Sequence, residues 1–150
     1  MKALISAIIG SILCISACGV AAQAKPEDVI KFRKGAYQVI GWHNATLARM
    51  IKGEMPFDAA EFARNAEIIA VMSNVVPNAF VAGSDKGETR AKPEIWSDAA
   101  NFKKAVDSFR AEVTKLAQVS KTATTLDQVR SQYAATAKTC GACHDNFRNK

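Results

Sequence analysis

The sequence has little cysteine and little histidine, with four and two of these residues among 150. Aromatic residues are also few, at 7%. Beyond the N-terminal segment, no stretch alternates between apolar and polar residues at a period of two, the pattern of a half-buried strand. These shortages exclude a disulfide framework and a strand-rich fold. They also argue against a nucleic-acid surface, which needs clustered basic residues among aromatics.

A length of 150 residues suits one domain with a single core. Hydrophobic residues make up 49% of the chain and charged residues 23%. These proportions exclude a disordered chain, a collagen-like chain and a multi-span membrane protein. The formal net charge of +6 at pH 7 is mildly basic and suits an acidic protein partner or a bound dianion.

The N-terminal segment has the pattern of a secretory signal. Lys2 is followed by uncharged residues through Ala24, with an apolar stretch over residues 3–18. The small residues Ala22 and Ala24 suit the −3 and −1 positions of a cleavage site. We therefore predict cleavage after Ala24, which leaves a periplasmic domain of residues 25–150 with no membrane span.

A second interpretation of the same segment remains open. Residues 15–18, Ile-Ser-Ala-Cys, resemble a lipoprotein cleavage box. Cleavage there would leave Cys18 at the new N-terminus with a lipid attached. Mass spectrometry of the mature N-terminus distinguishes the two interpretations.

Two of the four cysteines, Cys14 and Cys18, lie in this leader, so Cys140 and Cys143 are the thiols of the exported domain. A thioredoxin-like redox pair would require a βαβ context, which the pattern does not offer. A zinc site would need a second pair of ligands, and the only other histidine, His43, stands far upstream.

The residue after the second cysteine is His144, so residues 140–144 read C-x-x-C-H. Two thiols three positions apart on a helical turn can each bond one vinyl group of a haem. The adjacent imidazole then reaches the iron. The motif predicts one covalent haem c, with Cys140 and Cys143 as the attachment points and His144 as the axial iron ligand.

Apolar residues recur at spacings of three and four through most of the chain, which predicts helices. Pro26 and two acidic residues begin the first helix, which runs to about Ile51 with an inner stripe that includes Phe32 and Val39. Three more helices are predicted over residues 58–76, 98–119 and 125–147, with a long connection over residues 78–97. Short connections between amphipathic helices favour an all-α, antiparallel, up-down-up-down four-helix bundle.

Residues 25–150 resemble the cytochrome c′ family, the class II cytochromes c. The C-x-x-C-H motif alone is common to all c-type cytochromes, but here it lies at the C-terminal end of four helices. Class I cytochromes carry it near the N-terminus. The segments that carry the resemblance are Lys25-Pro26-Glu27-Asp28, Phe32-Arg33, Lys92-Pro93-Glu94-Ile95-Trp96 and Cys140-Gly141-Ala142-Cys143-His144 with Phe147-Arg148.

The predicted topology places the haem at the end of the bundle where the first helix begins and the last one ends. His43 lies too far along the first helix to reach it, and we expect it to be structural. The connection over residues 80–96 should close the pocket. The helical residues expected at this end are Phe32, Arg33, Ala36, Tyr37, Ile40, Ile69, Met72 and Val76.

The resemblance implies that Tyr37 covers the distal face of the haem. A neutral phenol, with an ordinary pKa of about 10, is a poor iron ligand, which predicts a five-coordinate, high-spin iron. Tyrosinate ligation as in catalase is one alternative, although there it is the proximal ligand, a role His144 fills here. A low-spin His144/Met72 pair is another, and would make the protein a carrier of the cytochrome c-556 type.

The resemblance also places Arg33 near the haem propionates, where an arginine fork suits a carboxylate. Lys34 and the backbone of Glu88 and Thr89 are further candidates for the propionate side. Arg148, one turn beyond His144, is either close to the proximal imidazole, as the family implies, or a solvated charge.

Three functions are compatible with such a site. Electron transfer with unidentified periplasmic redox partners is the general role of exported c-type haem proteins. An open, apolar distal site resembles the family's preference for NO and CO, which suits NO scavenging or sensing. A peroxidase would need a distal base, so we do not expect an enzyme. Family members commonly form homodimers through their first two helices, and we expect Ile30, Trp42 and Val71 to face outward there.

Overall fold

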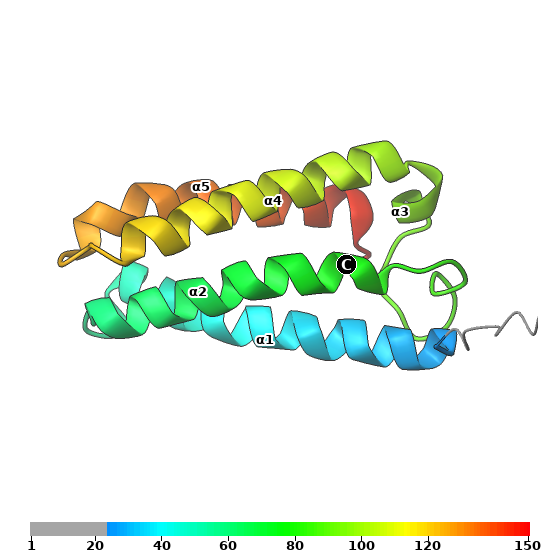
Figure 1. The fold of residues 1–150 in the computed structure, drawn as a ribbon, viewed down its shortest axis with the longest axis horizontal. Coiled ribbons are helices and arrows are strands. Elements are labelled where there is room, and N and C mark those ends of the chain that lie inside the picture. Colours follow the sequence, from blue (N-terminus) through cyan, green and yellow to red (C-terminus); the bar gives the residue numbers. More distant parts are fainter. Residues whose placement is uncertain (1–23) are drawn as a thin grey trace, which may run out of the picture.

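The computed structural model describes residues 24–150, which form a bundle of four long helices. Two short elements, η1 (Val76–Ala79) and α3 (Glu94–Ser97), lie in the connection between its two halves (Figure 1). Residues 1–23 of the predicted signal sequence, with Cys18, lie outside the described residues. The long helices are α1 (Pro26–Lys52), α2 (Ala59–Val75), α4 (Ala99–Ser120) and α5 (Leu126–Phe147).

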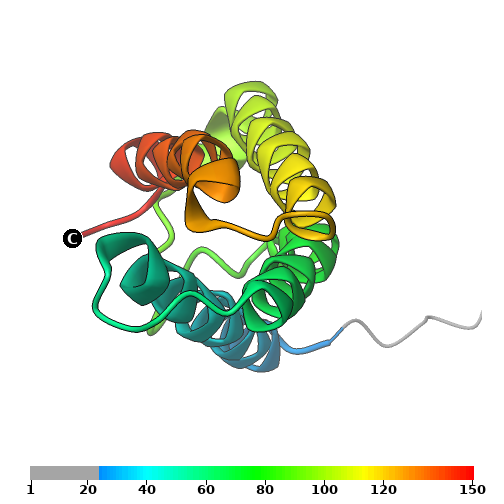
Figure 2. The same cartoon turned by 90° about the vertical axis from the view of Figure 1, so that its left-hand side faces the viewer.

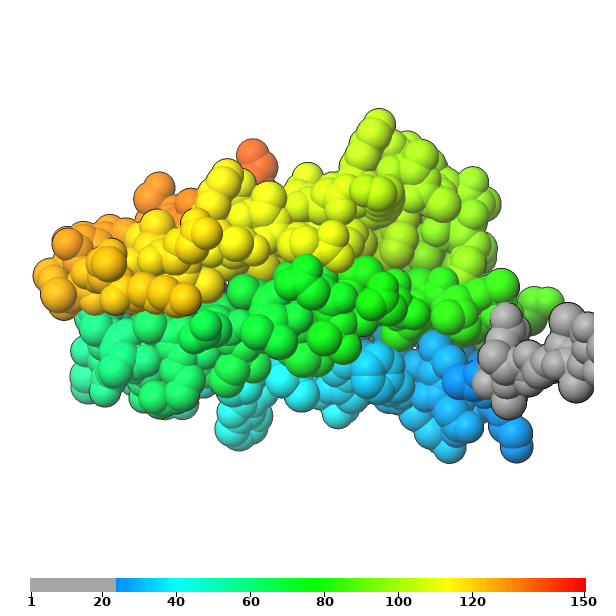
Figure 3. Space-filling view, viewed as in Figure 1, coloured from blue at the N-terminus to red at the C-terminus, as the bar shows by residue number. Residues whose placement is uncertain are grey.

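Helices α1 and α2 form one layer of the bundle, and α4 and α5 form the other (Figures 1 and 2). The side chains of α2 and α4 meet along the length of the molecule (Figure 3). Two long-range hydrogen bonds link α5 to α1: the Arg130 guanidinium donates to the Ile51 carbonyl at 2.9 Å, and the Tyr133 hydroxyl donates to Asn44 Oδ1 at 3.3 Å. The predicted all-α antiparallel bundle is confirmed. Over residues 24–150, no helix is long and apolar enough to cross a membrane.

The helix ends follow local rules that the sequence displays. Pro26 is the first residue of α1, and Gly53 ends it in the left-handed region at φ 75°, which glycine adopts without steric cost. The Asp58 carboxylate accepts the Glu61 backbone N–H at 2.8 Å and so caps α2. Thr125 and the side chain of Gln128 form the predicted capping box of α5.

The second predicted helix, over residues 58–76, ends differently from the prediction. Helix α2 stops at Val75, and residues 76–79 form the 3₁₀ turn η1. Pro77 has no backbone N–H and cannot continue an α-helical ladder, so the chain tightens there. The connection, predicted to be irregular, contains the single helical turn α3.

The apolar core lies in the half of the bundle far from the C-x-x-C-H motif. It joins the C-terminal part of α1, the N-terminal part of α2, the C-terminal part of α4 and the start of α5. Its buried members are Leu47, Met50, Phe62, Ala66, Ile69, Val113, Leu116, Ala117, Ala123 and Val129. Because this half is packed by the chain's own side chains, it supports the other half without depending on the haem motif.

The buried face of the N-terminal half of α1 matches the predicted stripe only in part: Ala36 is buried as expected, but two other members are not. Phe32 is 53% exposed and Val39 is 39% exposed, while Ile30 is buried at 5%. The long connection folds over α1 on the side of Ile30, whose side chain lies against Gly87. The expectation that Ile30 faces outward is therefore wrong, whereas Trp42 and Val71 are exposed as expected.

Candidate haem site

Helix α5 brings Cys140, Cys143 and His144 onto one face. At about 100° per residue, the three side chains span an arc of roughly 100° around the helix. Both thiols are partly buried and are not joined in a disulfide. The Cys140 thiol donates a weak hydrogen bond to the Thr136 carbonyl at 3.6 Å, the bond expected of a side chain that lies along its own helix.

The protonation of the two thiols distinguishes a redox-active pair from other uses of the C-x-x-C-H motif. Burial raises the pKa of both the Cys140 and the Cys143 thiol. A redox-active C-x-x-C pair requires the opposite shift, since its attacking sulfur must be a thiolate. Among residues 24–150, no three His, Cys, Asp or Glu side chains are grouped to hold a metal ion. The raised pKa values therefore argue against a redox-active dithiol.

The imidazole of His144 is biased toward its neutral form. Partial burial, followed by the positive charge of Arg148, lowers the pKa of His144 below its ordinary value. A neutral imidazole has the free lone pair that ligation of a metal requires.

Tyr37 on α1 faces the motif from the opposite side of this end of the bundle. Its phenol lies within electrostatic range of Cys143, Cys140 and Arg148. Although 39% of the side chain is exposed, the surrounding protein removes enough water to raise the pKa of Tyr37 to about 12, and Cys143 adds to the shift. The phenol is therefore neutral at physiological pH.

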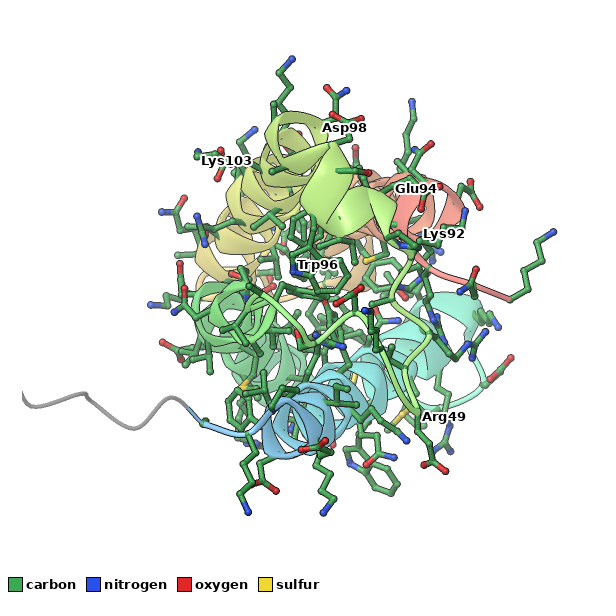
Figure 4. The ribbon with its side chains drawn as sticks, turned by 90° about the vertical axis from the view of Figure 1, so that its right-hand side faces the viewer. Arg49, Lys92, Glu94, Trp96, Asp98 and Lys103 are labelled. Carbon is green, nitrogen blue, oxygen red and sulfur yellow. The ribbon has the colours of Figure 1, made fainter. Side chains whose placement is uncertain are left out.

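Aromatic rings close this end of the bundle around the motif. Phe80 contacts Tyr37, Trp96 and Phe102 edge to face, with ring centroids 6.4, 6.2 and 4.9 Å apart. Phe102 in turn contacts Phe147, one turn after the motif, at 5.3 Å. Figure 4 shows Trp96 in the middle of this end, between the helices. The sequence predicted that the connection closes the pocket, but it did not single out Phe102 as the ring that joins the connection to α5.

Arg33 is the most deeply buried charged group at this end, with 3% of its surface exposed. One terminal nitrogen donates to the Ala79 carbonyl and to Ser84 Oγ, both at 2.9 Å. The other donates to the Ser84 carbonyl and to Thr89 Oγ1, both at 2.8 Å. The guanidinium also lies 4.7 Å from the centre of the Phe80 ring. Arg33 thus ties α1 to the long connection.

The residues predicted for the propionate side are brought together by this network. Besides the Arg33–Thr89 hydrogen bond, Lys34 lies 3.8 Å from the Glu88 carboxylate in an exposed ion pair. All four residues therefore lie where α1 meets the connection. Contact of any of them with a propionate stays a prediction.

The last residues of the chain form a clasp that the sequence did not predict. Ala91 and Arg148 form an isolated antiparallel bridge. The Lys92 backbone N–H donates to the Phe147 carbonyl at 3.0 Å, and the Asn149 N–H donates to the Arg90 carbonyl at 2.8 Å. Backbone pairing of this kind does not require particular residue types, so no sequence pattern predicts it. We call residues 90–92 and 147–149 the clasp.

Two further residues singled out from the sequence are His43 and Met72. His43 lies midway along α1, where its Nδ1 is 2.7 Å from Asn65 Oδ1 and links α1 to α2. The Asn65 side-chain amide donates to the Glu61 carbonyl at 2.7 Å, which leaves Oδ1 to accept from His43. Met72 is partly buried near the end of α2.

A family model for cytochrome c′ matches residues 28–148. The chain belongs to the cytochrome c′ family. It is 41% identical over 127 residues to cytochrome c′ of Rubrivivax gelatinosus, with 84% of this chain and 98% of that protein covered. It is 37% identical over 127 residues to the protein of Alcaligenes xylosoxydans, with 85% and 98% covered.

Solved structures of the family have the same fold. The crystal structure of the Rubrivivax gelatinosus protein has a TM-score of 0.79 at 40% identity, covering 83% of this chain and 98% of that one. Cytochrome c prime from Shewanella frigidimarina has a TM-score of 0.81 at 34% identity, with 85% and 99% covered. Similar structures also include a nitric oxide complex and a carbon monoxide complex of variants of the Alcaligenes xylosoxidans protein.

Cytochromes c′ carry a covalently bound c-type haem, and the residues of this chain fit that group. The two thiols are free and lie on the helix face that Tyr37 opposes, and the adjacent imidazole is biased toward the neutral form. Cys140 and Cys143 would hold the haem by thioether bonds. His144 would ligate the iron on the proximal side, and Tyr37 would cover the distal side.

The covalent attachment can be tested by substitution of the motif. We expect Cys140→Ala and Cys143→Ala each to weaken thioether-linked haem, and the double variant to abolish it, because each thiol bonds one vinyl group. His144→Ala should leave the thioethers and remove the proximal ligand. Acid-acetone extraction followed by absorption spectroscopy measures both effects. Full, acid-stable haem in the double cysteine variant would contradict the attachment.

The Arg33 network predicts a large difference between two neighbouring residues. Arg33→Met should lower the free energy of unfolding by about 3 kcal/mol, because the Ala79 and Ser84 carbonyls lose their buried donors. Lys34→Met, which removes an exposed ion pair to the same connection, should cost less than about 1 kcal/mol. Urea unfolding of the two holoproteins compares them. Equal losses would show that Arg33 does not anchor the connection.

Proposed function

We propose that the chain is a periplasmic c-type haem protein that transfers electrons and binds NO or CO at an open distal site, with a five-coordinate, high-spin iron. Export would follow cleavage after Ala24. When bound, the haem supplies a one-electron ferric/ferrous couple and a coordination position for diatomic gases. The observation that carries the proposal is the neutral phenol of Tyr37 opposite the C-x-x-C-H motif.

The pKa of Tyr37 supports an open coordination position. A phenol with a pKa of about 12 stays protonated near pH 7, and a protonated phenol is a poor iron ligand beside an imidazole. The ring is also held edge-on by Phe80 at 6.4 Å. Tyr37 therefore fills space over the distal side and excludes water without taking the place of a ligand.

The surroundings of Tyr37 favour gas binding over acid-base chemistry. The hydrogen bonds of the Arg33 terminal nitrogens go to the connection, so this cation does not act as a positioned donor over the distal side. A peroxidase needs a distal base, and a phenol whose pKa is raised to about 12 does not serve as one near pH 7. NO and CO, which the Alcaligenes xylosoxidans variants bind, need no such base. Dedicated NO scavenging or sensing is the alternative physiological use of the same site.

A homodimer through α1 and α2 is also part of the proposal. Trp42 is 76% exposed and Val71 is 56% exposed, and tryptophan is among the residues enriched at the centre of protein interfaces. Val39 and Val75 add exposed apolar surface on the same two helices.

The spin state distinguishes the open site from a His144/Met72 pair. We expect the ferric and ferrous holoprotein to be high-spin at neutral pH, because Tyr37 occupies the distal side as a neutral group. Met72→Leu should leave the absorption and EPR spectra unchanged. A methionine-to-iron charge-transfer band in the far red of the ferric spectrum, lost in Met72→Leu, would overturn the open site in favour of a low-spin carrier.

Removal of the Tyr37 ring should open the distal side. We expect Tyr37→Ala to raise the rate constant for CO binding by at least about tenfold, with the same amount of haem bound, because the ring bulk no longer blocks approach. Flash photolysis measures the rate. Phe32→Ala, which removes an exposed ring from the same helix, is the control and should leave the rate unchanged. No acceleration in Tyr37→Ala would show that Tyr37 does not cover the iron.

The homodimer predicts a strong effect of the largest exposed ring. Trp42→Glu should shift the holoprotein from dimer to monomer at micromolar concentration, since it places a charge in an apolar contact. Lys31→Glu on the same helix, a substitution at an already charged and exposed position, is the control. Sedimentation velocity measures both, and a monomeric unmodified holoprotein would rule the dimer out.

A further inference from the structure

A depression in the surface lies beside His144, at the end of the bundle that carries the haem motif. It is lined by the exposed imidazole and by residues of the clasp and its neighbours. Four of the lining side chains are basic, and Asp145 is the acidic one. The basic residues are Arg90, Lys92, Arg148 and Lys150, and we call them the basic face.

The clasp holds the basic face in a defined arrangement. The Lys92 ammonium donates to the Asp145 backbone carbonyl at 2.8 Å, and Arg90 Nε donates to the Asn149 carbonyl at 2.9 Å. Figure 4 shows Lys92 next to the C-terminal end of α5. Two chain segments far apart in the sequence therefore present their charges on one surface.

These charges are not neutralised by neighbouring carboxylates. The acceptors of Lys92 and Arg90 are backbone carbonyls, and within the described part of the chain none of the four basic side chains forms an ion pair. Some other basic side chains are paired: Lys103 pairs with Asp107 at 2.6 Å, and Lys121 lies 3.6 Å from the Glu67 carboxylate. The basic face is thus a local excess of positive charge.

The form of the surface favours a protein over a small anion. Arg90, Arg148 and Lys150 are exposed, and they stand around the rim of the depression. A bound phosphate would require donors that converge on one buried point, whereas charges spread over an exposed rim match carboxylates spread over a partner's surface.

We propose that the basic face is the docking surface for an acidic redox protein, which seats its carboxylates around His144. This inference rests on the electron-transfer function proposed above. A partner docked there lies against the residue that would hold the iron, so the electron path is short. With haem bound, the partner would give up one electron and the ferric iron would accept it, with no bond formed or broken. Complementary charge speeds the encounter and makes it sensitive to salt.

The test is a binding titration of the holoprotein with a strongly acidic flavodoxin as the probe, at low and high ionic strength. In Lys92→Gln/Lys150→Gln we expect binding at low salt to weaken by about fivefold or more, with a flatter salt dependence, since rim charges act mainly through long-range attraction. Lys52→Gln/Lys121→Gln removes the same two charges at the other end of the bundle and should change binding less than about twofold.

Equal weakening in the two double variants would overturn the inference, because net charge alone would then explain binding. Inorganic phosphate that competes with flavodoxin at micromolar concentration would also overturn it, in favour of a small-anion site. Lys150→Glu, at an exposed position, serves as a second variant should Lys92→Gln disturb the clasp. Its haem spectrum and thermal midpoint should match those of the unmodified protein while its binding weakens.

Stopped-flow reduction separates this inference from the proposed function. Reduced flavodoxin should reduce the haem of the unmodified protein faster than that of Lys92→Gln/Lys150→Gln. A neutral small reductant should reduce the two proteins at the same rate. Reduction by both reagents with no effect of the variant would reject the docking surface and leave electron transfer standing. Failure of both reagents to reduce the haem would reject electron transfer. The binding titration would then be the test of whether the basic face binds an acidic protein.

Discussion

The haem-bearing end of this protein depends on the buried guanidinium of Arg33. A charged group that leaves water is costly unless its donors are hydrogen-bonded. The connection therefore has to fold so that the Ala79 and Ser84 carbonyls and the Thr89 hydroxyl meet Arg33. That conformation places Phe80 against the guanidinium. Thr89 also accepts the Ala91 backbone N–H at 3.1 Å, which leads directly into the clasp with the end of α5.

The two ends of the bundle differ in what their side chains do: one end supplies the apolar core, and the other surrounds the haem motif. At one end, close-packed side chains such as Leu47, Phe62 and Leu116 supply most of the burial. At the other end, aromatic edges, two thiols and an imidazole surround the site. Burial at that end shifts the groups of the site toward their neutral forms: it raises the pKa of Tyr37 and of the two thiols and lowers that of His144. A site of neutral groups suits an iron couple and apolar gases better than acid-base catalysis.

Much of the fold and the centre of the site could be predicted from the sequence. Helix ends at Pro26, Gly53 and Thr125 follow rules that act within one or two turns. The C-x-x-C-H spacing predicts covalent haem for the same reason, since a single helical turn aligns its three side chains. The topology placed Tyr37 at the haem end together with several other residues of the first helix. Only the resemblance to the family singled it out as the residue on the distal side.

The sequence by itself determined the helices, the covalent haem motif and the end of the bundle where it lies, because each depends on residues close together in the chain. Only the tertiary structure decided which face of the first turns of α1 is buried, since Ile30 is covered by a connection that comes later in the sequence. The same holds for the partners of Arg33 and for the bridge between Ala91 and Arg148. These contacts join distant segments through backbone carbonyls and N–H groups, which every residue carries, so no local pattern distinguishes them.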